Sequence, residues 1–137
     1  MTQQEKVCVI IAAKNAQETI GRAVRSALAE PEVAEVVVVD DGSNDRTMAA
    51  AAEADDGSKR LDIIRFRVNR GPSAARNHAI AISRAPLISI LDADDFFFCH
   101  GVVLSGLDFH DPWPLVGLTL LDSAREVDSC ENFYEEK

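Results

Sequence analysis

The segment Leu87-Ile-Ser-Ile-Leu-Asp-Ala-Asp-Asp95 joins a strand-like apolar run to a cluster of acidic residues. Its first five residues include four branched apolar ones, which is typical of a short strand buried on both faces. Three carboxylates follow within four positions, and they repel one another unless a positive charge lies among them. Mg²⁺ and Mn²⁺ suit such a set, because they bind oxygen ligands and keep positions open for water and phosphate. A solvated acidic loop is the alternative that this segment alone leaves open.

Outside this segment, the chain alternates strand patterns with helical patterns. Buried strands are predicted at four places, which are Val7–Ala12, Val36–Val39, Leu61–Val68 and Leu87–Leu91. Three helices are predicted between the strands. The first begins at Thr19, carries an apolar stripe and is ended by Pro31. The second is the alanine-rich run Thr47–Ala54, and the third begins at Pro72 and ends before Pro86. The order β-α-β-α-β-α-β predicts an α/β fold with a mostly parallel sheet and helices on both faces.

In such a fold the loops that leave the parallel strands lie along one edge, where ligands of open α/β sheets bind. Four polar segments should therefore meet there, which are Lys14-Asn15, Asp40-Asp41, Asn69–Asn77 and Asp92–Asp95. Acidic pairs at two separate strand ends favour a ligand site over a solvated loop. Just after the second strand, Ser43, Asn44 and Asp45 are expected to cap the next helix.

Composition limits the choice of function. A chain of 137 residues, 47% hydrophobic and 27% charged, is large enough for one globular domain. Its net charge of −9 argues against nucleic acid as a partner. Basic residues concentrate in Lys59–Arg84, which holds seven of them and one acid. This block forms either a solvated face or an attraction for an anionic ligand.

The cysteines and the N-terminal residues indicate where in the cell the protein is expected. Cys8, Cys99 and Cys130 are odd in number and lack metal-ligand spacing, which favours a reduced chain. The polar start predicts no signal peptide, and no apolar run approaches the ~20 residues that a membrane span requires. We therefore expect a cytoplasmic protein without a transmembrane segment. Peripheral association at the inner face of the membrane is left open.

Several familiar active sites have no counterpart in the sequence. A dinucleotide-binding G-x-G-x-x-G, a P-loop G-x-x-x-x-G-K-[ST] and the G-x-S-x-G of serine hydrolases are all absent. His78, His100 and His110 have no evident partners, so they are expected at the surface or in helix packing.

Four segments together resemble the family 2 glycosyltransferases of the GT-A fold. These segments are Val7–Asn15, Val36–Asp45, Asn69–Asn77 and Leu91–Asp95, in the family's order and spacing over about Lys6–Phe97. Bacterial exopolysaccharide enzymes of the succinoglycan type are similar in particular. The resemblance implies a Rossmann-like GT-A half that binds a nucleotide-diphosphate sugar, with a UDP-sugar favoured. It also implies a saccharide or lipid-linked saccharide acceptor in polysaccharide biosynthesis.

The resemblance further implies roles for single residues. The nucleotide-sugar-binding residues would be Ala13, Asn15, Asp40, Asp41, Arg76, Asn77, Asp92 and Asp94. Among these, Asp41 would contact the base with Asp40 beside it, and Asp92 would face the ribose. Mn²⁺ or Mg²⁺ would bind Asp94, with Asp95 as a further ligand, and would bridge the donor diphosphate. Arg76 and Asn77 would line the nucleotide crevice.

Two features depart from the family pattern. An aromatic residue that stacks on the base commonly follows the first strand, but here Lys14 takes that place. After Phe97 the pattern stops, so we expect residues 1–98 to form the nucleotide-sugar-binding domain and residues 99–137 to be a divergent segment. Both a truncated copy of a longer enzyme and a frame-shifted one fit this pattern. The catalytic base is unknown, because Asp108 and Asp111 are expected to be surface residues.

Two other functions stay open at this point. A non-catalytic fragment would bind the nucleotide sugar without transferring it. A sugar-phosphate nucleotidyltransferase has a related topology, but it usually carries a glycine-rich, basic loop after its first strand. The corresponding segment here, Ala12–Asn15, contains no glycine.

Overall fold

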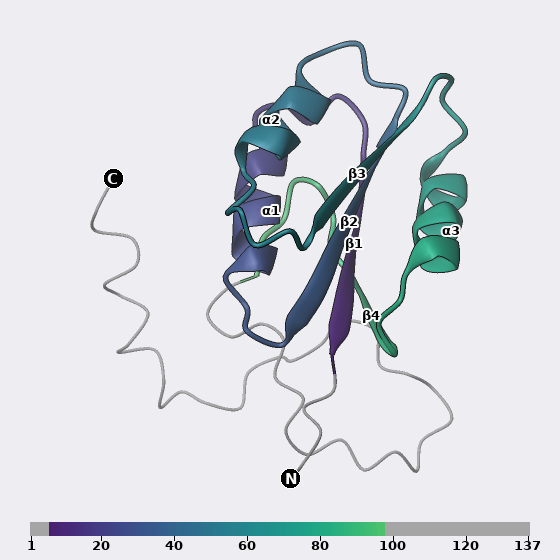
Figure 1. Cartoon of the computed structure of the whole chain (residues 1–137). Helices are drawn as coiled ribbons and strands as arrows, with labels where there is room; N and C mark the ends of the chain where they lie inside the picture. The colour runs from purple at the N-terminus through teal and green to yellow at the C-terminus, as the bar shows by residue number, and fades with distance from the viewer. Residues whose placement is uncertain (1–5, 98–137) are drawn as a thin grey trace, which may run out of the picture.

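A computed structural model of the chain describes residues 6–97. Strands and helices alternate along them (Figure 1). The strands are β1 (Val7–Ala13), β2 (Val33–Asp41), β3 (Leu61–Phe66) and β4 (Leu87–Ile90). The helices are α1 (Ile20–Leu28), α2 (Thr47–Glu53) and α3 (Pro72–Ile82). The predictions for the segment 99–137, with Asp108, Asp111, Cys99, Cys130, His100 and His110, lie outside the described residues.

The four strands form one parallel sheet in the order β3-β2-β1-β4. Helices cover both faces, with α1 and α2 on one side and α3 on the other (Figure 1). On β1, Val9 and Ile11 pack with the buried side of α1, while the alternate residue Ile10 packs with Ala75 and Ala79 of α3. This arrangement of three layers confirms the predicted α/β fold.

Two strands differ from their predicted form. β2 extends over Val33–Asp41 rather than Val36–Val39, because it pairs with β1 on one side and β3 on the other. The prediction that β4 is buried on both faces is wrong, since Ile88 is 38% exposed and the other β4 residues are half-buried. Within residues 6–97, β4 ends the sheet with β1 as its neighbour, and an end strand has fewer side-chain contacts than a central one.

His78 and Cys8, two residues with distinctive chemistry in the sequence, both pack within the fold, but only Cys8 is fully buried, and His78 is half-buried. His78 on α3 packs edge-to-face on Phe66, with 5.4 Å between ring centroids, as expected for a helix-packing histidine. Cys8 on β1 is a free, buried thiol, and burial raises its pKa to about 11, so it is protonated at neutral pH. No helix within residues 6–97 is both long and apolar enough to cross a bilayer.

Candidate functional site

The loops that leave the four strands meet at one edge of the sheet, where two clefts open. The larger cleft, about 360 Å³ in volume, is lined by Ala12, Lys14, Asn15, Ala16, Thr19, Asp92, Ala93 and Asp94. The smaller cleft, about 210 Å³, is lined by Ala12, Ala13, Lys14, Asp41, Asn69 and Pro72. Ala12 and Lys14 line both clefts, so the end of β1 forms the boundary between them.

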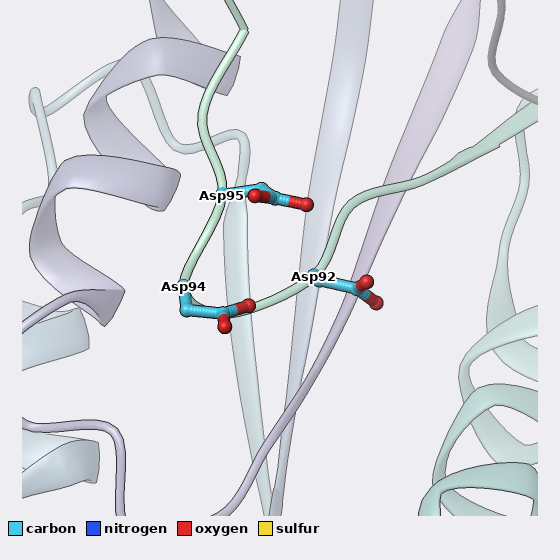
Figure 2. A group of neighbouring side chains, drawn as sticks. All are labelled: Asp92, Asp94 and Asp95. Atoms are coloured by element: carbon cyan, nitrogen blue, oxygen red, sulfur yellow. The ribbon is translucent and has the colours of Figure 1, made fainter.

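Asp92, Asp94 and Asp95, here called the acidic triad, lie on the loop that follows β4 (Figure 2). All three are exposed, and each has a carboxylate oxygen within 4.8 Å of those of the others. Oxygens on opposite sides of one Mg²⁺ lie about 4.2 Å apart, since each bond is about 2.1 Å long. Small side-chain movements therefore bring the triad into range of a single ion, and its oxygen donors match the preference of Mg²⁺ and Mn²⁺. The triad fits a divalent cation.

Helix α1 holds the loop that carries the triad. Arg22 donates from Nη2 to the carbonyl oxygen of Asp94 at 3.1 Å, and its guanidinium lies 4.4 Å from the centre of the Phe96 ring. Further along, the Phe97 amide donates to Ser26 Oγ at 3.0 Å. These contacts join positions that are 72 and 71 residues apart, so local sequence patterns do not indicate Arg22 or Ser26.

Helix α3 contributes Arg76 from the other face of the sheet. Its Nη2 lies 3.1 Å from Asp92 Oδ1, and the two side chains are 36% and 57% exposed. The ion pair offsets the charge of one triad carboxylate and places a cation beside the larger cleft. Asn77, the next residue, is exposed, its side chain makes no hydrogen bond within the described part of the chain, and it lines neither cleft.

Asp40 and Asp41, in contrast, are buried and already engaged, with exposures of 1% and 3%. Both oxygens of Asp41 accept backbone amides, from Arg70 at 2.7 Å and Gly71 at 2.9 Å, which ties the end of β2 to the loop before α3. Asp40 accepts the Ser43 amide at 3.1 Å and pairs with Arg65 at 3.6 Å. Asp41 borders the smaller cleft, whereas Asp40 does not line it.

The turn that follows Asp41 depends on a glycine. Gly42 has a φ of +72°, and a Cβ at this position would lie 2.9 Å from the backbone nitrogen of Asn69. Only glycine therefore permits β2 to end in this close approach to the loop before α3. The approach sets the width of the smaller cleft, since Asp41 and Asn69 both line it.

The loop after β1 is bonded to the loop after β2. Asn15, at a left-handed φ of 49°, donates its amide to Ser43 Oγ at 2.8 Å, and its Oδ1 accepts the Asn44 amide at 2.9 Å. The Ala16 amide donates to Thr47 Oγ1 at 2.8 Å. The prediction that Ser43 and Asn44 cap α2 is wrong, because both residues form hydrogen bonds with Asn15 in the loop after β1 instead.

Of the predicted caps, only Asp45 contacts the start of α2. Its Oδ1 accepts the Thr47 amide at 2.9 Å and also the Thr47 hydroxyl. The hydrogen bond from that hydroxyl is the main reason why the pKa of Asp45 lies below its usual range. Asp45 therefore stays ionised and supports the loop to which Asn15 is bonded.

Comparison with known proteins identifies the family. Residues 8–100, more than half of the chain, match the model of glycosyl transferase family 2. The chain belongs to this family. The resemblance found in the sequence is confirmed, and with it the assignment of the sheet to part of a GT-A fold.

Three known proteins are similar to this family 2 chain. The succinoglycan biosynthesis protein ExoU of Rhizobium meliloti (strain 1021) is 70% identical over 123 residues, which cover 87% of this chain and 35% of ExoU. The crystal structure of S. aureus TarS 1–349 in complex with UDP-GlcNAc matches 66% of this chain and 27% of TarS, with a TM-score of 0.61 and 27% identity. The mannosyltransferase PcManGT from Pyrobaculum calidifontis, in complex with GDP-Man and Mn²⁺, matches 70% of this chain and 29% of PcManGT, with a TM-score of 0.63 and 26% identity. The chain thus spans about a third of the length of these relatives.

Proposed function

We propose that residues 6–97 form the donor-binding half of a metal-dependent glycosyltransferase that uses a nucleotide-diphosphate sugar in exopolysaccharide biosynthesis. The acidic triad at the rim of the larger cleft carries this proposal. Similarity to ExoU supports the exopolysaccharide pathway. The UDP-GlcNAc in TarS and the GDP-Man with Mn²⁺ in PcManGT support a nucleotide-sugar donor and a divalent cation.

Asp94 and Asp95 would hold Mn²⁺ or Mg²⁺, with Asp92 beside them. When bound, the cation offsets the charge of the donor diphosphate and stabilises the charge that develops there as the sugar leaves. The chain itself contributes Arg76, whose ion pair with Asp92 lowers the negative charge that an approaching diphosphate meets. Arg22 keeps the triad loop against α1 while the donor binds.

The nucleotide, for which UDP is favoured, would extend from the smaller cleft to the triad. Ala13 and Asn15 would border it, since each lines one of the clefts. Asp41 would face the base, because each of its carboxylate oxygens accepts one amide and keeps a further lone pair for a donor on the base. Asp40 would act behind Asp41 by holding the turn at Ser43. Arg76 and Asn77 would approach the nucleotide from α3.

On this proposal, residues 6–97 bind the donor and do not supply the general base that acts on the acceptor. Of the carboxylates that line the clefts, Asp41 holds backbone amides, and Asp92 and Asp94 are assigned to the donor and its metal. Deprotonation of an acceptor hydroxyl requires a further general base. The base would therefore lie outside residues 6–97. It would serve a saccharide or lipid-linked saccharide acceptor at the cytoplasmic face of the membrane.

Calorimetry tests the proposal directly. The 137-residue chain is titrated with UDP in Mn²⁺, in Mg²⁺ and in chelator. We expect measurable affinity with either ion and a loss of about tenfold or more with chelator, because the triad repels an unneutralised diphosphate. Equal affinity with and without the ions would contradict the metal-bridged donor site. Absence of UDP binding under all three conditions would contradict the proposed function.

A further inference from the structure

Lys14 lies at the boundary of the two clefts. It is exposed, it lines both clefts, and no other lysine or arginine lines either of them. Within residues 6–97 its side chain makes no hydrogen bond and no ion pair. An ammonium group without a partner thus stands between the acidic triad on one side and Asp41 on the other.

The backbone that carries Lys14 is fixed on both sides. Ala13, the last residue of β1, is paired with Asp40 of β2 in the sheet. Asn15 and Ala16 are bonded at 2.8 Å to Ser43 and Thr47. The side chain of Lys14 is therefore anchored at a defined point while its ammonium is free to turn. Binding through such an anchored group avoids the cost of ordering the loop.

The position of Lys14 determines which part of a ligand it meets. A nucleotide with its base in the smaller cleft and its terminal phosphate at the acidic triad has to cross the boundary at Lys14. The groups that lie between base and sugar in such a ligand are the ribose and the diphosphate, and only the diphosphate is anionic. A lysine at this point offers a compact charge that suits phosphate oxygens, and it cannot stack on a base as an aromatic residue does.

We propose that Lys14 binds the diphosphate of the donor directly and is a specificity-determining residue of this chain. It selects ligands by the charge of their phosphates rather than by the face of their base. This inference rests on the proposed function, because it requires a nucleotide diphosphate in the two clefts. It assigns a part of the phosphate recognition to the β1 loop, in addition to the part assigned to the triad and its cation.

The test uses the full chain in Mn²⁺ with two probes, UDP and inorganic pyrophosphate, which has the phosphates but no base. Lys14→Met keeps most of the length of the unbranched side chain and removes its charge. We expect it to weaken both probes by a similar factor of about tenfold or more, the usual effect of losing a charge-assisted hydrogen bond. Lys14→Arg should restore most of the affinity. Lys6→Met is the matched control, because Lys6 is an exposed lysine at the opposite end of β1.

The outcomes separate the inference from the proposed function. If the parent chain binds UDP and Lys14→Met binds both probes within twofold of it, the inference is wrong and the proposed function stands. If Lys14→Met weakens UDP but not pyrophosphate, Lys14 contacts the base or ribose and the phosphate assignment is wrong. An equal loss in Lys6→Met would show a general charge effect and would also overturn the inference. If the parent binds neither probe in Mn²⁺, both the inference and the proposed function fail.

Discussion

At the scale of single residues, the carboxylates of this sheet edge divide by burial. Asp41 is 3% exposed and accepts two backbone amides, so its charge holds the loop before α3 in place. Asp94 is exposed, and its side chain makes no hydrogen bond within residues 6–97. A carboxylate without protein partners keeps all its lone pairs for a cation, whereas one with two amide partners keeps only one further lone pair on each oxygen. Asp41 therefore shapes the site, and Asp94 is available to a cation.

Asp94→Asn tests this division. We expect the variant to lose the part of its UDP affinity that depends on Mn²⁺, by at least about tenfold, because even partners of metal ligands contribute 10–100-fold to metal affinity. Its melting temperature without metal should equal that of the parent, since no protein contact of the carboxylate is lost. Calorimetry and thermal unfolding measure the two effects. Asp55→Asn, an exposed carboxylate in the loop between α2 and β3, is the control, and unchanged UDP–Mn²⁺ affinity in Asp94→Asn would refute the ligand assignment.

At the scale of elements, the connection between α3 and β4 is secured from β2. The buried carboxylate of Glu35 accepts the backbone amides of Arg84 and Ala85, the latter at 2.9 Å, and lies 3.2 Å from Arg84 Nε. Burial alone would raise the pKa of Glu35, but the hydrogen bonds from Ala85 and Arg84 together hold it below its usual value. The start of β4, and through it the path to the acidic triad, is thus tied to the centre of the sheet.

Glu35→Gln should lower the free energy of unfolding at pH 7 by roughly 1–3 kcal/mol, because a buried amide loses its charged acceptor. A carboxylate whose pKa is lowered by folding stabilises the protein above its unfolded pKa, and this contribution is lost as the pH falls through the folded value. The difference in the free energy of unfolding between parent and variant should therefore shrink below pH 4.5, the unperturbed pKa of Glu35. Urea unfolding between pH 7 and pH 3 measures it.

The control for Glu35→Gln is Glu53→Gln. Glu53 forms an ion pair with Arg46 at 3.1 Å in which both side chains are exposed, at 68% and 76%. Exposed pairs of this kind contribute about 0–1 kcal/mol. A Glu35→Gln variant that is no less stable than Glu53→Gln, or whose deficit stays constant down to pH 3, would contradict the anchoring role of Glu35.

At the scale of the whole molecule, the sequence predicts what local patterns encode. The apolar run of β1 and the stripe of α1 predict their elements closely, since strand and helix periodicities lie within a few residues. The acidic triad is found for the same reason, because its members are adjacent in the chain. The exposure of β4 and the bond from Arg22 to Asp94 are not predictable in this way, because they depend on which segments become neighbours in space.

Contacts between the loops of the site are likewise not predictable from local sequence patterns. The pattern at Ser43 and Asn44 is compatible with a helix cap, and nothing local indicates that these residues satisfy the loop after β1 instead. The pairing of Arg76 with Asp92 likewise requires the right-handed crossover that brings α3 beside the end of β4. Sequence therefore predicts the residue types of the candidate site better than it predicts their partners.

The last prediction concerns turnover by the whole chain. On the proposed assignment, every carboxylate that lines the clefts serves the donor, its metal or the loop before α3, which leaves none as a general base, and such bases contribute ~10²–10⁴-fold to rate. We expect the chain to bind UDP-sugars with Mn²⁺ and to release UDP slowly by hydrolysis, without dependence on an acceptor. The measurement follows UDP and glycosylated product separately, with a panel of saccharide acceptors, and Asp94→Asn reports the background. Acceptor-dependent product at ~1 s⁻¹ or faster, a rate ordinary for enzymes, would contradict this expectation and place a base within residues 98–137.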